Sequence, residues 1–361
     1  MDFLNRNQTR VLTKLPAGRT PISCKWVFKV KSGANGEPDR YKARLVARGF
    51  TQCYGYDYTE TCAPVARLNT LRAVLALANQ ERLLVHQIDV DLEEVIYMVQ
   101  PGGFQQGDDL VCRLNRSIYG LKQASRAWNE RFHQFVTSIG FRRSDNDPCL
   151  YIRSSGLEKV FLVLYVDDIL VIGHNLKGIR TVKSLLSKEF EMVNLDAVSC
   201  FLGMRIQRDV DGRVMRIDQQ NYLKGLLKRF GMDDCKLVFT PIECHLKLRN
   251  GEEGQRTDKP YCELVGCLMY VTLASRPDLS ASVNLMSQYQ SCPTEEHWIH
   301  LKRILRYVKG TLNLMLEFRG DDREAAPTAF SDADWANDVN DRRSVTGYLF
   351  KIFGLACLAY T

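Results

Sequence analysis

Two adjacent carboxylates are the residues of this chain best suited to chemistry. Asp167 and Asp168 stand in the middle of the apolar run VFLVLYVDDILVIG, from Val160 to Gly173. Such runs are typical of buried strands, and a buried carboxylate is costly unless it is paired, hydrogen-bonded or bound to a cation. We interpret the segment as a tight β-hairpin with both acids at its tip. The alternative is an ordinary turn that uses Asp, although turns usually also recruit Gly or Asn.

A divalent metal would explain acids in this position. Converging carboxylates can hold two cations about 4 Å apart, and the cations offset the mutual repulsion of the acids. Mg²⁺ suits oxygen ligands and substrate phosphates. A third acid must come from a neighbouring strand, and Asp89, which ends the strand-like run LLVHQID, is the candidate. Such a site would activate a 3′-hydroxyl and stabilise a leaving pyrophosphate in an in-line displacement.

Several elements are predicted around these acids. Alternating residues on both sides of Asn35-Gly36 predict a hairpin, and a second hairpin is expected to turn at Asp211-Gly212. Apolar periodicity predicts helices over 68–83 and 125–141, the latter with Trp128, Phe132, Phe135 and Ile139 on one core-facing side. The first hairpin has a basic second arm that would either meet a triphosphate or form a solvated face: Arg40, Lys42, Arg44 and Arg48.

The composition is that of a globular protein without the marks of a zinc-binding, secreted or membrane-spanning chain. The chain has 361 residues, 45% hydrophobic and 25% charged, which is enough for two or three globular domains. A net charge of +7 permits a polyanionic partner but does not prove one. Twelve cysteines are scattered along the chain without a CxxC pair, so we do not expect a zinc site. We expect free thiols in a reducing intracellular setting. We expect neither a signal peptide nor a membrane span.

The motifs together resemble the Pol polyprotein of copia-type retrotransposons. They follow the family's order over nearly the whole chain, and they include CKWVFKVK, DRYKARLVARGFTQ, VHQIDV, IYMVQPGGF, RLNRSIYGLKQASRAW, LYVDDILVIG, FLGMRI and SDADWA. The resemblance implies the reverse transcriptase region with the start of ribonuclease H. The implied fold is α+β, a right-hand polymerase with fingers, palm and thumb and an antiparallel palm sheet. Its implied parts are fingers and palm over 1–240, a helical thumb or connection over 241–320, and a truncated ribonuclease H-like segment over 321–361.

The same resemblance implies roles for individual residues. Asp89, Asp167 and Asp168 match the three catalytic, metal-binding acids, and the implied cation is Mg²⁺ or Mn²⁺. Arg44 matches the arginine that contacts the incoming triphosphate, Lys31 its lysine partner, and Gln123 the glutamine that lines the nucleotide pocket. Tyr165 would pack near the primer end. The implied partners are an RNA or DNA template with its primer, deoxynucleoside triphosphates, and the rest of the polyprotein; no membrane is implied. The implied location is the cytoplasm, in a virus-like particle, or the nucleus.

This copy departs from the family pattern in two places. The family has a triphosphate-cradling turn with an aromatic residue between the first catalytic acid and the segment LEEVIYM, whereas here QIDVDLEEVIYM runs straight across. We therefore expect impaired activity. In SDADWA, Asp332 matches the first metal-binding acid of ribonuclease H, and the chain ends at Thr361 before the remaining acids would appear.

Three functions remain as hypotheses. The first is an RNA-directed DNA polymerase. The second is a catalytically dead remnant that keeps the fold and nucleic-acid binding, which the missing turn favours. The third is another palm enzyme, such as a nucleotide cyclase, but a cyclase holds no template, and the segments YKARLVARGF and LKQA argue against it.

Overall fold

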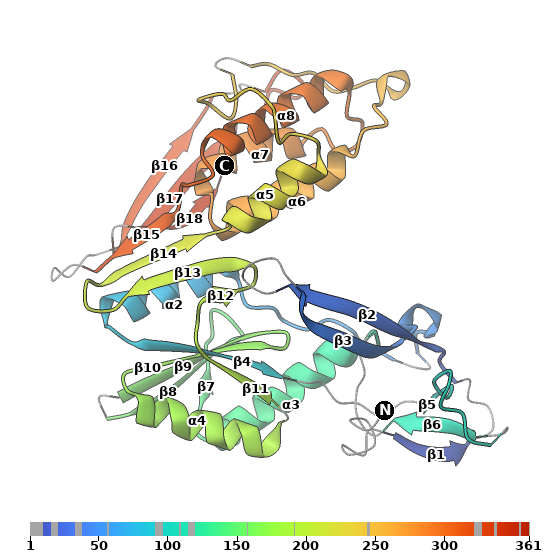
Figure 1. Ribbon diagram of the computed structural model, residues 1–361. Helices are drawn as coiled ribbons and strands as arrows, with labels where there is room; N and C mark the ends of the chain where they lie inside the picture. The colour runs from blue at the N-terminus through green and yellow to red at the C-terminus, as the bar shows by residue number, and fades with distance from the viewer. Residues whose placement is uncertain are drawn as a thin grey trace. The chain divides into compact units, whose positions relative to one another are not determined.

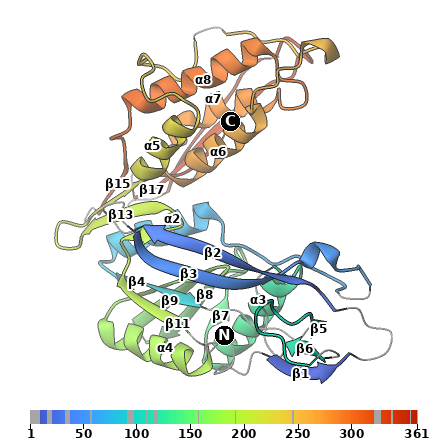
Figure 2. The same ribbon diagram turned by 45° about the vertical axis from the view of Figure 1, so that its right-hand side comes forward.

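The computed structural model describes residues 10–15, 21–32, 38–55, 58–90, 97–107, 110–114, 120–156, 158–190, 192–243, 246–320, 327–335, 338–353 and 355–360. The chain forms two compact units. The first contains Met1–Ala66, Ile88–Val171 and Arg180–Leu195, and the second contains Arg67–Gln87, Ile172–Ile179 and Asp196–Thr361. Each unit therefore combines segments that are distant in the sequence, as the colours in Figure 1 and Figure 2 show.

A six-stranded sheet carries the paired acids. Its strands lie in the order β11 (Met192–Ala197), β4 (Leu84–Val90), β10 (Asp168–Gly173), β9 (Glu158–Tyr165), β8 (Leu150–Ser155) and β7 (Arg142–Arg143). β9 and β10 are neighbours joined by two residues, so the predicted hairpin with acids at its tip is confirmed. Each strand has five consecutive buried residues, which is the pattern of a strand covered on both faces.

Helices α3 (Ala124–Ser138) and α4 (Leu176–Glu189) accompany this sheet (Figure 1). The predicted apolar face of α3 is confirmed at Trp128 and Phe132, which are buried, whereas Phe135 and Ile139 are half-buried and Val136 is the third buried apolar residue. Phe132 packs edge-on against Tyr151 of β8, with ring centroids 5.6 Å apart, and also contacts Phe190, which follows α4. These aromatic contacts fix α3 against the strand next to β9.

Two smaller sheets lie in the first unit. β2 (Cys24–Ser32) pairs antiparallel with β3 (Pro38–Ala47), which confirms the first predicted hairpin, although its turn at 33–37 lies outside the described residues. A 3-10 helix, η1 (Gly49–Thr51), follows β3. β1 (Arg10–Lys14), β6 (Leu110–Leu114) and β5 (Tyr97–Met98) form the other sheet. A shared apolar cluster joins hairpin and sheet, and it includes Ile22, Leu45, Met98 and Cys112.

The second unit contains an antiparallel sheet of β12 (Cys200–Phe201), β13 (Met204–Asp209), β14 (Val214–Asp218) and β15 (Leu316–Arg319). The predicted turn at Asp211-Gly212 joins β13 to β14, and the backbone N–H of Gly212 donates to the Asp209 carboxylate at 2.9 Å. Helix α2 (Leu68–Gln80) is tied to this sheet by Asn79, whose amide donates to the carbonyl oxygens of Arg213, in the turn before β14, and of Phe318 in β15.

A helical cluster forms the rest of the second unit. It contains α5 (Gln220–Arg229), α6 (Tyr261–Ala274), α7 (Ser280–Ser287) and α8 (Glu295–Gly310), with the 3-10 helices η2 (Glu253–Gln255) and η3 (Pro277–Leu279). One core of buried leucines, valines and aromatic residues unites the four α-helices. β16 (Thr328–Ala333), β17 (Thr346–Ile352) and β18 (Leu355–Tyr360) form a final antiparallel sheet.

The architecture is thus a mixed α/β fold with antiparallel sheets, as the sequence predicts. The assignment of fingers, palm, thumb and ribonuclease H to residue ranges stays a prediction. Among the residues described above, no helix is both long enough and apolar enough to cross a bilayer.

Candidate catalytic site

The two acids lie in and next to a strained turn. β9 ends at Tyr165 and β10 begins at Asp168, so Val166 and Asp167 alone make the connection. All four residues are half-buried, whereas the strand interiors on both sides are fully buried. The acids are therefore less buried than their place in the apolar run suggested. Val166 has a φ of 55°, and the left-handed region costs an L-residue with a side chain about 1–2 kcal/mol.

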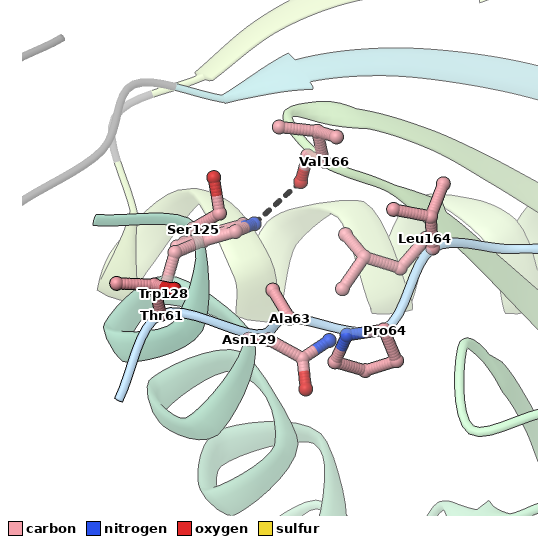
Figure 3. Close-up of a pocket in the computed structure, with 9 residues that line it drawn as sticks. Thr61, Ala63, Pro64, Ser125, Trp128, Asn129, Leu164 and Val166 are labelled. Carbon is pink, nitrogen blue, oxygen red and sulfur yellow. Dashed lines mark hydrogen bonds between the residues drawn. The ribbon is translucent and has the colours of Figure 1, made fainter. Parts of the chain in front are cut away.

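A tryptophan on α3 supports this turn. The indole N–H of Trp128 donates to the carbonyl oxygen of Val166 at 2.5 Å (Figure 3). Trp128 is 3% exposed and packs edge-on against Phe190, with centroids 5.0 Å apart. The sequence predicts Trp128 only as a core residue. The available signal was chemical, since a buried indole N–H usually finds an acceptor.

A cavity of about 240 Å³ borders the turn through Val166 (Figure 3). Its walls are formed by Thr61, Ala63, Pro64, Val65, Ser125, Trp128, Asn129, Leu164 and Val166. Asn129 is only 6% exposed, and its amide nitrogen has no hydrogen-bond partner within the described part of the chain. Most of the residues that line this cavity are apolar, and neither Asp167 nor Asp168 is among them.

Asp89 lies on the strand next to the turn. It is half-buried and is the penultimate residue of β4, the neighbour of β10, which begins with Asp168. Across the ranges that the structure describes, no three His, Cys, Asp or Glu side chains form a group that could hold a metal ion. The joint metal-binding role of the three acids therefore stays a prediction. The expected missing turn would lie next to residues 91–96, which are outside the described ranges.

The predicted triphosphate ligands lie on the β2–β3 hairpin. Lys31 is paired with Arg40, and Arg44 is paired with Val27. The side chains of Lys31 and Arg44 lie outside the described residues, so their contact with a triphosphate stays a prediction.

Gln123 lies at the start of the helix that holds the turn. It is the N-cap residue of α3, it is half-buried, and its side-chain oxygen accepts a hydrogen bond from Gln52 at 2.9 Å. Trp128 lies on the same helix, one turn further on. One rigid element therefore carries both the predicted nucleotide-pocket residue and the support of the acid-bearing turn. The sequence did not indicate Gln52 as a partner of Gln123.

Asp332 lies in the second unit, exposed on β16 and paired with Gly347 of β17. Asp332 and Asp334 line a second cavity of about 240 Å³ beside α7. The role of Asp332 in a ribonuclease H site stays a prediction.

Comparison with known proteins identifies the family. Residues 7–244 match the family model described as reverse transcriptase (RNA-dependent DNA polymerase). The retrovirus-related Pol polyprotein from transposon TNT 1-94 of Nicotiana tabacum is 41% identical over 371 residues, covering 98% of this chain and 28% of that protein. The corresponding polyprotein from transposon RE2 of Arabidopsis thaliana is 37% identical, covering 92% of this chain and 23% of that protein. The chain thus spans about a quarter of the length of these relatives.

Among solved structures, a foamy viral protease-reverse transcriptase in complex with double-stranded DNA aligns with a TM-score of 0.47 and 11% identity, over 99% of this chain and 53% of that chain. The tobacco alignment extends over more residues than the 361 of this chain, so this chain has gaps relative to that polyprotein. The resemblance to copia-type elements is confirmed by the family match and by both plant relatives. The chain belongs to the reverse transcriptase (RNA-dependent DNA polymerase) family and corresponds to that region of copia-type Pol polyproteins.

Proposed function

We propose that this chain is built for RNA-directed DNA polymerisation, adding deoxynucleotides to a primer on an RNA or DNA template. The observation that carries the proposal is the family match over residues 7–244, which contains the hairpin tip with Asp167 and Asp168 and the neighbouring strand with Asp89. The partners would be primer–template, deoxynucleoside triphosphates and the remainder of the polyprotein. The location would be the cytoplasm, in a virus-like particle, or the nucleus.

The donor set fits a hard divalent cation, because three half-buried carboxylates at strand ends offer oxygen ligands. Among the described residues, these three side chains do not form a three-ligand group. Asp89, Asp167 and Asp168 would hold Mg²⁺ or Mn²⁺, and the bound cations would lower the barrier to attack by the primer hydroxyl and stabilise the leaving pyrophosphate.

The protein's other residues would bind and orient the substrates. Arg44 and Lys31 would bind the triphosphate, since guanidinium and ammonium groups pair well with phosphate oxygens. Gln123 would line the nucleotide pocket and Tyr165 would pack near the primer end. Trp128 would keep the turn in place through the Val166 carbonyl.

The activity of this copy is proposed to be low. By the family resemblance, a turn is missing after Asp89, where QIDVDLEEVIYM runs straight across. A misplacement of about 1 Å at a reacting centre can cost on the order of 100-fold in rate. A catalytically dead remnant that still binds nucleic acid is therefore the second candidate function.

Binding and extension measured on one preparation separate the two candidates. The basic chain should bind primer–template duplexes without sequence preference, and its affinity should fall steeply from low to physiological salt because phosphate-bound counterions are released. Binding together with extension supports the polymerase, and binding without extension supports the remnant. A salt-independent affinity, or no binding at all, would contradict both.

A further inference from the structure

A buried glutamine connects the end of the β2–β3 hairpin to the loop before α3. Gln52 directly follows η1 and is 4% exposed. Its side-chain oxygen accepts the backbone N–H of Lys122 at 2.9 Å, and its amide nitrogen donates to the side-chain oxygen of Gln123 at 2.9 Å. The oxygen and the nitrogen of this buried amide thus form hydrogen bonds with two consecutive residues, Lys122 and Gln123.

These bonds determine which way the Gln123 amide points. The oxygen and nitrogen of a glutamine amide are ordinarily assigned from the surrounding network. Here the network is anchored by the Lys122 backbone N–H, which can only donate and must therefore face the oxygen of Gln52. The Gln52 nitrogen is then directed at Gln123, and only the oxygen of Gln123 can accept its hydrogen bond. The amino end of Gln123 therefore points away from the Gln52 amide.

The backbone around this pair leaves little room for adjustment. A Cβ placed on Gly49 would lie 2.1 Å from the carbonyl oxygen of Gly120, and one on Gly120 would lie 2.2 Å from that of Ala47. The Lys122 ammonium group also donates to the Gln52 carbonyl oxygen at 3.2 Å and to the Tyr58 hydroxyl at 3.1 Å. The segment after β3 and the loop before α3 are therefore held in close contact at several points.

We propose that Gln52 is a positioning residue that fixes the orientation of the Gln123 amide, so that Gln123 presents its donor end to an acceptor oxygen of the incoming nucleotide. The inference rests on the proposed role of Gln123 in the nucleotide pocket. It goes further by assigning the polarity of that contact and the residue that sets it.

Gln52→Glu tests the proposal with little change in size. The carboxylate still accepts from Lys122 but has no N–H to donate, so Gln123 must turn its own amino end toward it and present its oxygen to the nucleotide. The affinity for a fluorescently labelled deoxynucleoside triphosphate, measured on the full chain with Mg²⁺ and primer–template, should fall about tenfold, the scale of one lost hydrogen bond plus one repulsive contact.

Gln100→Glu is the matched control. Gln100 is 6% exposed and its amide is bonded to backbone groups of residues 106, 107 and 110. This variant reports the general cost of a buried Gln-to-Glu change. It should lower the melting temperature and leave nucleotide affinity within about twofold of the parent, which is within about 0.4 kcal/mol.

A double-mutant cycle distinguishes positioning from a structural role. Gln123→Ala should reduce nucleotide affinity, and adding Gln52→Glu to it should cause no further loss, because Gln52 acts through the amide that is gone. An additive loss, or an unchanged affinity in Gln52→Glu alone, would overturn the inference while leaving the proposed function intact. If Gln123→Ala had no effect, or the parent chain bound no nucleotide, the proposed role of Gln123 would fail and the inference with it.

Discussion

The hydrogen bond from Trp128 to the Val166 carbonyl predicts that Trp128→Phe loosens the acid-bearing turn. Phenylalanine fills part of the indole site but cannot donate, so the Val166 carbonyl loses the bond seen at 2.5 Å. Val166 is held at a φ of 55°, and a residue in this region persists only when its surroundings hold it there. Removing the donor should therefore make the turn more mobile as well as less stable.

The expected loss has two parts. A buried carbonyl left without its donor costs about 1–3 kcal/mol. The smaller ring removes roughly two carbon groups from contact with Phe190 and Phe132, which costs about 1–2 kcal/mol at ~0.8 kcal/mol per group. We expect the free energy of unfolding of the first unit to fall by about 2–5 kcal/mol.

Trp298→Phe provides the comparison. Trp298 is similarly buried, at 7% exposure against 3% for Trp128, and it packs against Phe230. It lies in the second unit, so amide hydrogen exchange in α3 and in α8 should be used to measure the two losses separately. Trp298→Phe should show the packing loss alone, about 1–2 kcal/mol. If Trp128→Phe costs no more than Trp298→Phe, the bond to Val166 does not support the turn.

Three further predictions concern the glycine contact, pH and metal. Gly120→Ala should destabilise the chain by more than about 2 kcal/mol and Gly55→Ala by only about 1 kcal/mol, because both glycines have a positive φ but, of the two, only Gly120 would place a Cβ against a backbone oxygen. Thermal unfolding of the two variants measures both losses, and equal losses would contradict the close approach of Gly120 to Ala47. Burial lowers the pKa of His297 in the folded chain, so the unfolded chain binds a proton at a higher pH and the free energy of unfolding should decline as pH falls through about 6.5. Denaturant unfolding of His297→Asn should show a shallower decline with pH, and an unchanged decline would show that His297 is not its cause. Millimolar Mg²⁺ or Mn²⁺ should raise the melting temperature of the parent but not of the chain with Asp167→Asn and Asp168→Asn; equal shifts in both chains would place the metal elsewhere.

The sequence was most informative where structure depends on local patterns. The hairpin tip at Asp167 and the buried face of α3 follow from strand alternation and helical periodicity, and both are confirmed. The bond between Trp128 and Val166 joins residues 38 positions apart, and the bond between Gln52 and Gln123 joins residues 71 apart. Such pairs depend on tertiary packing and leave no periodic signal. The sequence shows that a buried indole or amide needs a partner but not which one.

The two units illustrate the same limit at a larger scale. The predicted parts are contiguous, with borders at 240 and 320. Those parts stay a prediction; the compact units join segments from distant parts of the chain, because sheet strands and their covering helices come from separate stretches of sequence. The roles of Lys31 and Arg44 come from family resemblance, since their positions on a hairpin alone would equally suit a solvated face.

Primer extension on an RNA template, with Mg²⁺ and Mn²⁺ tested separately, examines the central claim most directly. The unmodified chain should extend a primer very slowly or not at all. Inserting a family-like turn with a phenylalanine between Val90 and Asp91 should restore extension, and Asp167→Asn with Asp168→Asn in that restored chain should abolish it again. Robust extension by the unmodified chain would show that the missing turn is dispensable. Extension that survives loss of both acids would contradict the assignment of the catalytic site.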